Sequence, residues 1–177
     1  MKRALFLDRD GVINTDNNYV YKKEDIEFID GIFDLVKFAN SKKYLVIVVT
    51  NQAGIGRGFY SEKDFLNLTS WMKKKFVSNE AKIDHFYFSP FHPIYGQGKY
   101  KKNSEFRKPN PGMFFKAKIE FGIDLENSIM IGDRDTDIKA AQRAHINNII
   151  CFGDNCKSTE SIKIKKLINA KKYLKKY

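Results

Sequence analysis

Aspartates at the ends of apolar runs are the residues of this chain best suited to chemistry. The apolar stretch Ala4 to Leu7 ends in Asp8 and Asp10, and a glycine follows. Two carboxylates so close together repel each other, and this repulsion is tolerable when a hard cation such as Mg²⁺ lies between them. Asp133 follows another apolar run in the same way. We therefore expect Asp8, Asp10 and Asp133 to hold Mg²⁺.

Polar side chains also follow two further apolar runs. Thr50 and Asn51 end the run at 44–51, and Arg107 and Lys108 lie in the irregular segment after the run at 83–89. A hydroxyl and an ammonium beside a magnesium site can hold the oxygens of a phosphate that is being transferred. Each pattern alone also describes an ordinary strand-to-turn junction or the start of a helix. Their joint order along the chain favours a phosphate site.

The elements that must position these residues alternate along the chain. Apolar, β-branched runs predict strands at 3–8, 44–51, 83–89, 127–133 and 147–152. Helical spacing of apolar residues and capping signals predict helices at 30–43, 61–77, 111–121 and 135–144. This alternation predicts an α/β three-layer sandwich around a parallel sheet of about five to six strands, without a large cap domain. The carboxyl ends of the strands, and with them the polar residues, then meet at one edge of the sheet.

The four motifs together resemble those of the haloacid-dehalogenase-like (HAD-like) phosphatases: DxDG, TN, a lysine before proline, and GDxxxD, each after an apolar run. The resemblance covers about residues 3–153. The segments RDGVIN, DNNY, FIDG, VVTNQAGIGRG and RKPNPGM are most similar to the branch that acts on heptose 1,7-bisphosphate. GDRDTD is closer to the sibling branch that acts on histidinol phosphate. The resemblance implies a Rossmann-like fold and a phosphatase that requires Mg²⁺.

The resemblance also implies roles for individual residues. Asp8 is expected to be the nucleophile that forms an aspartyl phosphate, and Asp10 the acid and base that serves the leaving group and the water. Thr50 and Lys108 are expected to hold the transferring oxygens. Asp8, the backbone carbonyl of Asp10, and Asp133 are the expected magnesium ligands. Asp137 is expected to orient Lys108 or a metal-bound water.

A second group of residues is expected to bind the rest of the substrate. Its members are polar or lie next to motif residues, and they are Asp16, Asn17, Asn18, Tyr19, Asn51, Gln52, Ala53, Arg107 and Arg134. Within it, Arg107 and Arg134 are candidates for a distal anionic group. For Arg57, surface charge and a substrate role are equally good interpretations. The three histidines are interpreted as structural, with His92 the one that could belong to the site.

One departure from the family concerns metals and thiols. The relatives usually carry a zinc loop with three cysteines and one histidine, but the corresponding positions here are Ser89, Phe91, Ser104 and Phe106. We expect no zinc, and we expect the active-site loop at 89–106 to be held by an aromatic cluster of Phe88, Phe91, Tyr95, Tyr100 and Phe106. Cys151 and Cys156 are interpreted as reduced thiols, because two cysteines make no disulfide framework or zinc site.

Charge and length limit the remaining possibilities. The 177 residues predict a single domain, 1–177, and no apolar run suits a membrane span or a signal peptide, so we expect a cytoplasmic protein. The net charge is +11, but the C-terminal segment 157–177 holds eight lysines and one glutamate and so supplies most of it. We interpret this segment as a solvated surface and expect a monomer whose partner is a small phosphorylated sugar, not a nucleic acid or a membrane.

The resemblance implies removal of the 7-phosphate of D-glycero-D-manno-heptose 1,7-bisphosphate through an aspartyl phosphate, in the synthesis of lipopolysaccharide or a related glycan precursor. The first alternative is a phosphatase for histidinol phosphate or another small phosphomonoester. The second is a protein that binds nucleic-acid ends or removes their 3′-phosphates, for which the basic C-terminal segment would supply salt-sensitive affinity. Phosphate release from a panel of these substrates separates the three.

Overall fold

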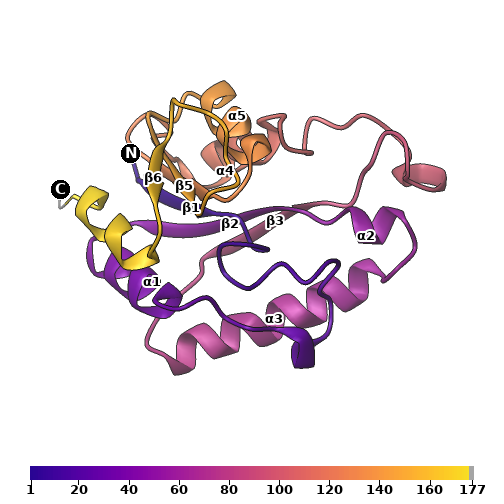
Figure 1. Cartoon of the computed structure of the whole chain (residues 1–177), viewed down its shortest axis with the longest axis horizontal. Coiled ribbons are helices and arrows are strands. Elements are labelled where there is room, and N and C mark those ends of the chain that lie inside the picture. Colours follow the sequence, from indigo (N-terminus) through magenta and orange to yellow (C-terminus); the bar gives the residue numbers. More distant parts are fainter. Residues whose placement is uncertain (176–177) are drawn as a thin grey trace.

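The computed structural model describes residues 1–175, and its centre is one parallel sheet (Figure 1). The strands lie in the order β3-β2-β1-β4-β5-β6. Their bounds are β1 Ala4–Leu7, β2 Leu45–Asn51, β3 His85–Ser89, β4 Ile129–Gly132, β5 Asn148–Phe152 and β6 Ile162–Ile164. Every neighbouring pair is parallel, which confirms the predicted α/β architecture.

Helices cover both faces of this sheet. In Figure 1, α1 and α3 lie on one side, and α4 and α5 lie on the other. The α-helices are α1 Ile32–Ser41, α2 Ala53–Gly56, α3 Glu62–Ser78, α4 Gly112–Phe121 and α5 Asp135–Arg143; the 3₁₀ helices are η1 Lys23–Asp25, η2 Gly98–Tyr100 and η3 Leu167–Tyr173. The capping box of Ser61 and Asp64, expected from the sequence, starts α3.

The apolar runs form strands because side chains on both faces of the sheet are buried. In β1, Leu5 and Leu7 pack on the side of α1 and α3, whereas Ala4 and Phe6 pack on the side of α4 and α5. All four side chains are fully buried. A parallel strand that is covered on both faces reads as continuous apolar sequence, which is why these runs show no alternation with polar residues.

The strand order places the carboxyl ends of β1 and β4 at the centre of one sheet edge. β1 pairs with β2 on one side and with β4 on the other, so the chain order reverses beside β1. Open parallel sheets bind ligands in the crevice outside such a reversal. The residues that follow β1, β2 and β4 therefore lie where a ligand is expected.

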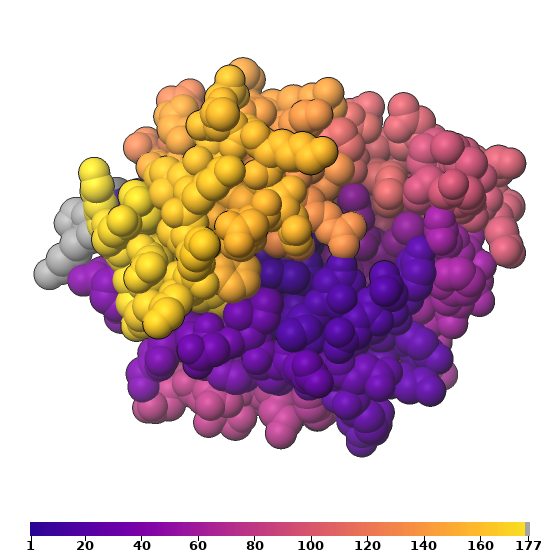
Figure 2. All heavy atoms as spheres, viewed as in Figure 1, coloured from indigo at the N-terminus to yellow at the C-terminus, as the bar shows by residue number. Residues whose placement is uncertain are grey.

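The C-terminal lysine-rich segment contains structure that the sequence did not predict. β6 extends the sheet, and η3 packs against α1, with Leu167 and Leu174 buried. Figure 2 shows this segment, in yellow, lying against the indigo and violet N-terminal part. The last two residues of the segment lie outside the described part of the chain. Within residues 1–175, no helix has the length and apolar character that crossing a membrane requires.

The two cysteines differ from the sequence-based interpretation. Cys151 and Cys156 are joined by a disulfide bond, so the interpretation of both as free thiols is wrong. Cys151 lies in β5, one residue before its end, and Gly153 with its positive φ follows the strand, so that Cys156 reaches Cys151. A spacing of five residues says nothing about such a turn, and the pairing was therefore not visible in the sequence.

The loop at 89–106 is partly held by the expected aromatic residues. Phe88 packs on Phe65 of α3, with ring centroids 4.4 Å apart, and Tyr100 packs beside the same cluster. The rings of Phe91 and Tyr100 lie 6.1 Å apart. These contacts agree with an aromatic anchor at the start and centre of the loop.

Two of the expected aromatic residues do not belong to this anchor. Tyr95 and Phe106 are exposed, and Phe106 instead has the ammonium of Lys116 over its ring. Backbone hydrogen bonds order the middle of the loop: the amide of His92 donates to the carbonyl of Tyr100 at 3.1 Å. The expectation that Phe106 anchors the loop is therefore wrong.

Candidate active site

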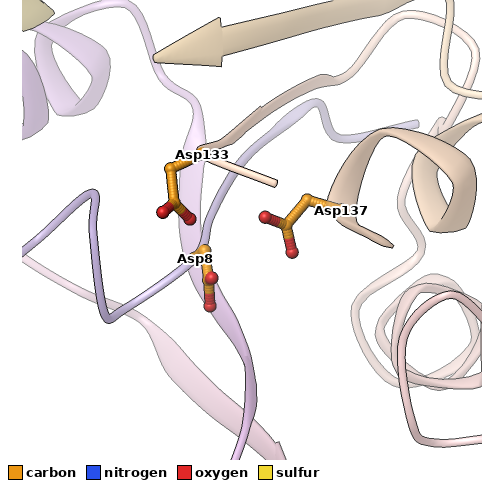
Figure 3. A group of neighbouring side chains, drawn as sticks. All are labelled: Asp8, Asp133 and Asp137. Atoms are coloured by element: carbon orange, nitrogen blue, oxygen red, sulfur yellow. The ribbon is translucent and has the colours of Figure 1, made fainter. Parts of the chain in front are cut away.

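Three buried carboxylates meet at the carboxyl edge of the sheet (Figure 3). Asp8 follows β1, Asp133 follows β4, and Asp137 comes from the first turn of α5. One oxygen of each lies within 4.8 Å of the others. Gly11 allows this approach, because a Cβ there would lie 2.3 Å from a carboxylate oxygen of Asp133. Its backbone is also in the left-handed region, with φ 89°.

The chemistry of this cluster fits a divalent metal. Carboxylate oxygens are the ligands that Mg²⁺ prefers. Asp133 Oδ1 is buried and has no hydrogen-bond partner among the described residues. A buried acceptor without a donor is costly, and a metal ligand bond would compensate it. Asp8 and Asp133 are therefore suited to hold Mg²⁺, whereas both oxygens of Asp137 have donors, Oδ1 from Lys108 and Oδ2 from the backbone amide of Arg134.

Burial and mutual repulsion change the acidity of these groups. Burial raises the pKa of Asp8 to about 8; Lys108 opposes this, and the charges of Asp137 and Asp133 add to it. Burial likewise raises the pKa of Asp133 to about 6, with a further contribution from Asp137. Without a metal, ionising both carboxyls at this buried position is therefore unfavourable, and a bound cation would favour their ionised forms.

Lys108 reaches into the cluster from the segment that precedes α4. Its ammonium lies 2.9 Å from Asp8 Oδ1 and 2.6 Å from Asp137 Oδ1, and it donates to the carbonyl of Val49 at 2.7 Å. Burial alone lowers the pKa of Lys108, but Asp137 and Asp8 outweigh it, so the pKa lies above its ordinary value. Lys108 is therefore a fixed positive charge beside Asp8.

The backbone of Lys108 is held by Asn51, at the end of β2. The Asn51 side chain donates to the carbonyl of Lys108 and accepts from its amide, both at 3.0 Å. These two bonds use the side-chain amide that we had expected to contact sugar hydroxyls. In this structure Asn51 fixes the chain that carries Lys108.

Asp10 lies beside the carboxylate cluster, and its side chain is not part of it. The guanidinium of Arg9 donates to both of its oxygens at 2.8 to 3.0 Å, and the amide of Asn14 adds a bond at 3.0 Å. Arg9 is fully buried and also donates to the carbonyl of Val20. Arg9 was missed in the sequence, because a charged residue between two aspartates gives no sign of burial.

Gln52 is also occupied by protein partners. Its Nε2 donates to Asp10 Oδ2 at 3.0 Å and to Thr50 Oγ1 at 2.8 Å, and its Oε1 accepts from the hydroxyl of Tyr60. Both protons of Gln52 Nε2 and one lone pair of its Oε1 are therefore used within the protein. Tyr60 was missed, because nothing in its spacing distinguishes it from a core aromatic residue.

A cleft of about 360 Å³ opens over these groups, and it gathers most of the residues expected from the sequence. All four expected catalytic residues line it, namely Asp8, Asp10, Thr50 and Lys108. Of the expected substrate contacts, those that line it are Asp16, Asn18, Tyr19, Asn51, Gln52, Ala53, Arg107 and Arg134. Asp133 belongs to the carboxylate cluster but is not in the cleft lining.

Some lining residues were left undecided or were missed, and one expected residue lies elsewhere. Arg57 and His92, both left open above, line the cleft, as do the unpredicted Asp135 and Thr136. Asn17 is exposed and outside the lining, with its amide donating to a neighbouring hydroxyl. An Asp–Asn–Asn–Tyr run does not tell which side chain turns outward.

Two arginines form a positive region at the side of the cleft. Arg57 lies over the ring of Tyr95, 4.3 Å from its centroid, and donates to the hydroxyl of Tyr19 at 2.6 Å. Burial and the charge of Arg57 lower the pKa of Arg107. Burial, Arg107 and Arg57 lower the pKa of His92 in the same way, which favours a neutral imidazole. By contrast, Arg134 is paired with the carboxylate of Asp16.

Comparison with known proteins agrees with this geometry. The HAD-hydrolase-like family model matches residues 105–165. The chain is 53% identical over 152 residues to the D-glycero-alpha-D-manno-heptose-1,7-bisphosphate 7-phosphatase of Burkholderia mallei, covering 86% of this chain and 80% of that protein. It is 44% identical over 149 residues to the corresponding beta-specific enzyme of Vibrio cholerae, covering 84% and 80%. The chain belongs to the heptose-bisphosphate phosphatase family of HAD-like hydrolases.

A solved member of this family has the same fold. The D,D-heptose 1,7-bisphosphate phosphatase from B. bronchiseptica, crystallised with magnesium and phosphate, matches with a TM-score of 0.82. The match covers 98% of each chain at 22% identity, and at that identity it supports the fold alone. The family membership inferred from the four motifs is confirmed by the sequence relatives.

Proposed function

We propose that this protein is a Mg²⁺-dependent phosphatase that removes the 7-phosphate of D-glycero-D-manno-heptose 1,7-bisphosphate through an aspartyl phosphate. The observation that carries the proposal is the pairing of Lys108 with Asp8 in a carboxylate cluster at the switch point of the sheet. The names of the sequence relatives supply the substrate.

Asp8 is the proposed nucleophile. Its carboxylate attacks phosphorus, the bond from phosphorus to the sugar oxygen breaks, and the phosphoryl group is held on Asp8 until water releases it. Lys108, 2.9 Å away, keeps a positive charge beside both the carboxylate and the incoming phosphate. When bound between Asp8 and Asp133, Mg²⁺ would supply further positive charge for the phosphate oxygens.

Asp10 is the proposed acid and base. It would give a proton to the departing sugar oxygen and later take one from the attacking water. Arg9, Asn14 and Gln52 hold its carboxylate at the cleft. Thr50 and Lys108 are proposed to bind the phosphoryl oxygens, by hydrogen bond and by charge.

The distal end of the substrate is assigned to the arginine side of the cleft. A bisphosphate has a second anionic group, and the neighbouring Arg57 and Arg107 offer two charges for it. Arg134 contributes less, because Asp16 already neutralises it. Asp16, Asn18 and Tyr19 remain the proposed contacts for the sugar.

The finer parts of the account are proposals as well. We propose one domain over residues 1–177, with the loop at 89–106 at the active site, acting as a monomer in the cytoplasm and without a nucleic-acid partner. We expect no zinc in the loop, because Ser89 and Ser104 supply no thiolate. The biosynthetic setting is a heptose-containing glycan precursor.

Phosphate release from a substrate panel tests this function. The panel holds both anomers of heptose 1,7-bisphosphate, histidinol phosphate and a 3′-phosphorylated oligonucleotide, each with excess Mg²⁺. We expect kcat/KM to be highest for one heptose anomer. A higher value for histidinol phosphate or for the oligonucleotide would contradict the proposed substrate, and it would do so without affecting the proposed chemistry.

A further inference from the structure

The side chain of Gln52 links Asp10, the proposed acid and base, to Thr50, a proposed phosphate contact. Its side chain is buried, and both protons of Nε2 are used, one on Asp10 Oδ2 at 3.0 Å and one on Thr50 Oγ1 at 2.8 Å. A single planar amide therefore fixes the distance and direction between the Asp10 carboxylate, in the turn after β1, and the Thr50 hydroxyl, in β2.

The hydroxyl of Tyr60 sets the orientation of that amide. It donates to Gln52 Oε1, so the oxygen of the amide faces Tyr60 and the nitrogen faces the cleft groups. Burial raises the pKa of Tyr60 well above its ordinary value, which keeps the hydroxyl protonated as a donor. Without this donor the amide could rotate, and its oxygen would then oppose the carboxylate of Asp10.

The bond from Gln52 also decides what Thr50 can do. Because Thr50 Oγ1 accepts from Gln52, its own proton is left to donate to something else. Thr50 is buried and lines the cleft, and the hydrogen bond that its hydroxyl makes within residues 1–175 is the one it accepts from Gln52. A phosphoryl oxygen in the cleft is the acceptor that fits.

Asp10 is fixed by the same amide together with the fork of Arg9. Arg9 donates to both carboxylate oxygens, and Gln52 adds the bond to Oδ2. A carboxylate with donors on both oxygens has a defined rotation about its side-chain bond. Correct rotation decides whether the proton of an acid reaches the leaving oxygen.

We propose that Gln52, oriented by Tyr60, is a positioning residue that aims the Thr50 hydroxyl at the phosphoryl group and holds Asp10 toward the leaving oxygen. The inference rests on the proposed phosphatase function. It replaces the expected contact between Gln52 and a sugar hydroxyl with a role in the chemical step.

Tyr60→Phe and Gln52→Ala test this role, with Tyr87→Phe as the matched control. Tyr87 is as buried as Tyr60, and its hydroxyl also donates to a side chain, that of Glu120. Tyr87 and Glu120 both lie outside the cleft lining. Each variant is assayed on heptose 1,7-bisphosphate and on 4-nitrophenyl phosphate. The second substrate releases a stable phenolate and needs no proton from Asp10.

We expect Tyr60→Phe to lower kcat on the heptose bisphosphate about 10-fold and Gln52→Ala about 100-fold, with KM within about threefold of wild type. The loss in kcat/KM on 4-nitrophenyl phosphate should be smaller, because this ratio reports the steps up to release of the leaving group, and in those steps only the contribution of Thr50 remains. Tyr87→Phe should keep wild-type kcat on both substrates. Melting temperatures establish that the variants are folded.

Three results would overturn the inference. They are a kcat within twofold of wild type for both folded variants, a change confined to KM, which would make Gln52 a substrate contact, and equal losses in kcat/KM on the two substrates. The proposed function fails in a different way, since the wild type would then release no phosphate from the heptose bisphosphate. An active wild type with equally active variants contradicts only the positioning role.

Discussion

The ammonium of Lys108 lies 2.6 Å from a carboxylate oxygen of Asp137, and both side chains are almost completely buried. Asp137 also accepts from the backbone amide of Arg134 at 3.1 Å and so belongs to the start of α5. One carboxylate thus ties the lysine before α4 to the helix after β4. The Lys108 ammonium that faces Asp8 is therefore positioned by α5, which follows β4.

Removing that carboxylate should therefore weaken the chemical step. In Asp137→Asn, Lys108 keeps its bond to Asp8 but loses its closest counter-charge, and we expect kcat to fall about 10- to 100-fold with little change in KM. Steady-state kinetics on the heptose bisphosphate measure this. Asp124→Asn, a change in a surface turn, is the control. A change in KM alone would mean that Asp137 acts on substrate binding.

The nucleophile assignment predicts a larger effect at Asp8. Asp8→Asn keeps the shape of the side chain but replaces the attacking carboxylate, so turnover should fall on the order of 10³-fold or more. Phosphate release measures turnover, and far-UV circular dichroism checks that the fold is kept. Activity within about tenfold of wild type would remove Asp8 from that role.

The metal assignment predicts how stability depends on pH. In the metal-free protein, burial raises the pKa of Asp8 to about 8 and that of Asp133 to about 6, well above the ordinary range of an aspartate. As the pH rises, the unfolded chain loses these protons at a lower pH than the folded protein does. Between about pH 4 and pH 8 the folded protein therefore holds more protons, and the free energy of unfolding should fall as the pH rises. Mg²⁺ should oppose this fall, because it binds the ionised carboxylates.

Melting temperatures in excess EDTA and in excess Mg²⁺ measure this coupling. The stabilisation by Mg²⁺ should be larger at about pH 8.5 than at about pH 5.5, and it amounts to about 2.7 kcal/mol when the metal is at 100 times its Kd. Asp133→Asn should need more Mg²⁺ for the same stabilisation. Equal Mg²⁺ effects at the two pH values, or equal requirements in the two proteins, would argue against this metal site.

Two phenylalanines that differ in burial should differ in how much they stabilise the protein around the loop at 89–106. Phe65 of α3 is 1% exposed and packs on Phe88, so Phe65→Ala should cost about 3 to 5 kcal/mol of stability. Phe106 is 37% exposed, and Phe106→Ala should cost less than about 1 kcal/mol. Chemical denaturation measures both. A large loss in Phe106→Ala would restore it as an anchor of the loop.

The apolar runs in the sequence predicted the sheet, and the polar residues directly after them predicted which side chains line the site. Both are local patterns that a sequence shows. The apolar run before Asp8 predicted a strand, and the parallel connections brought Asp8, Thr50 and Asp133 to one edge. Strand ends differed by one or two residues from the prediction. Such differences do not move the motif residues to another edge.

The parts that were missed depend on contacts between distant segments. Arg9 and Tyr60 became recognisable only through their bonds to Asp10 and Gln52, which no spacing encodes. The disulfide between Cys151 and Cys156 needed the turn after β5. The side-chain amide of Asn51, which we expected to contact the substrate, donates instead to the backbone carbonyl of Lys108.

The central claim is the removal of one particular phosphate from a heptose bisphosphate. Phosphorus NMR of the reaction of purified protein with heptose 1,7-bisphosphate and Mg²⁺ follows both phosphates at once. We expect the 7-phosphate signal to give way to inorganic phosphate while the 1-phosphate signal remains. Loss of the 1-phosphate, or no release of phosphate with excess Mg²⁺, would contradict the account.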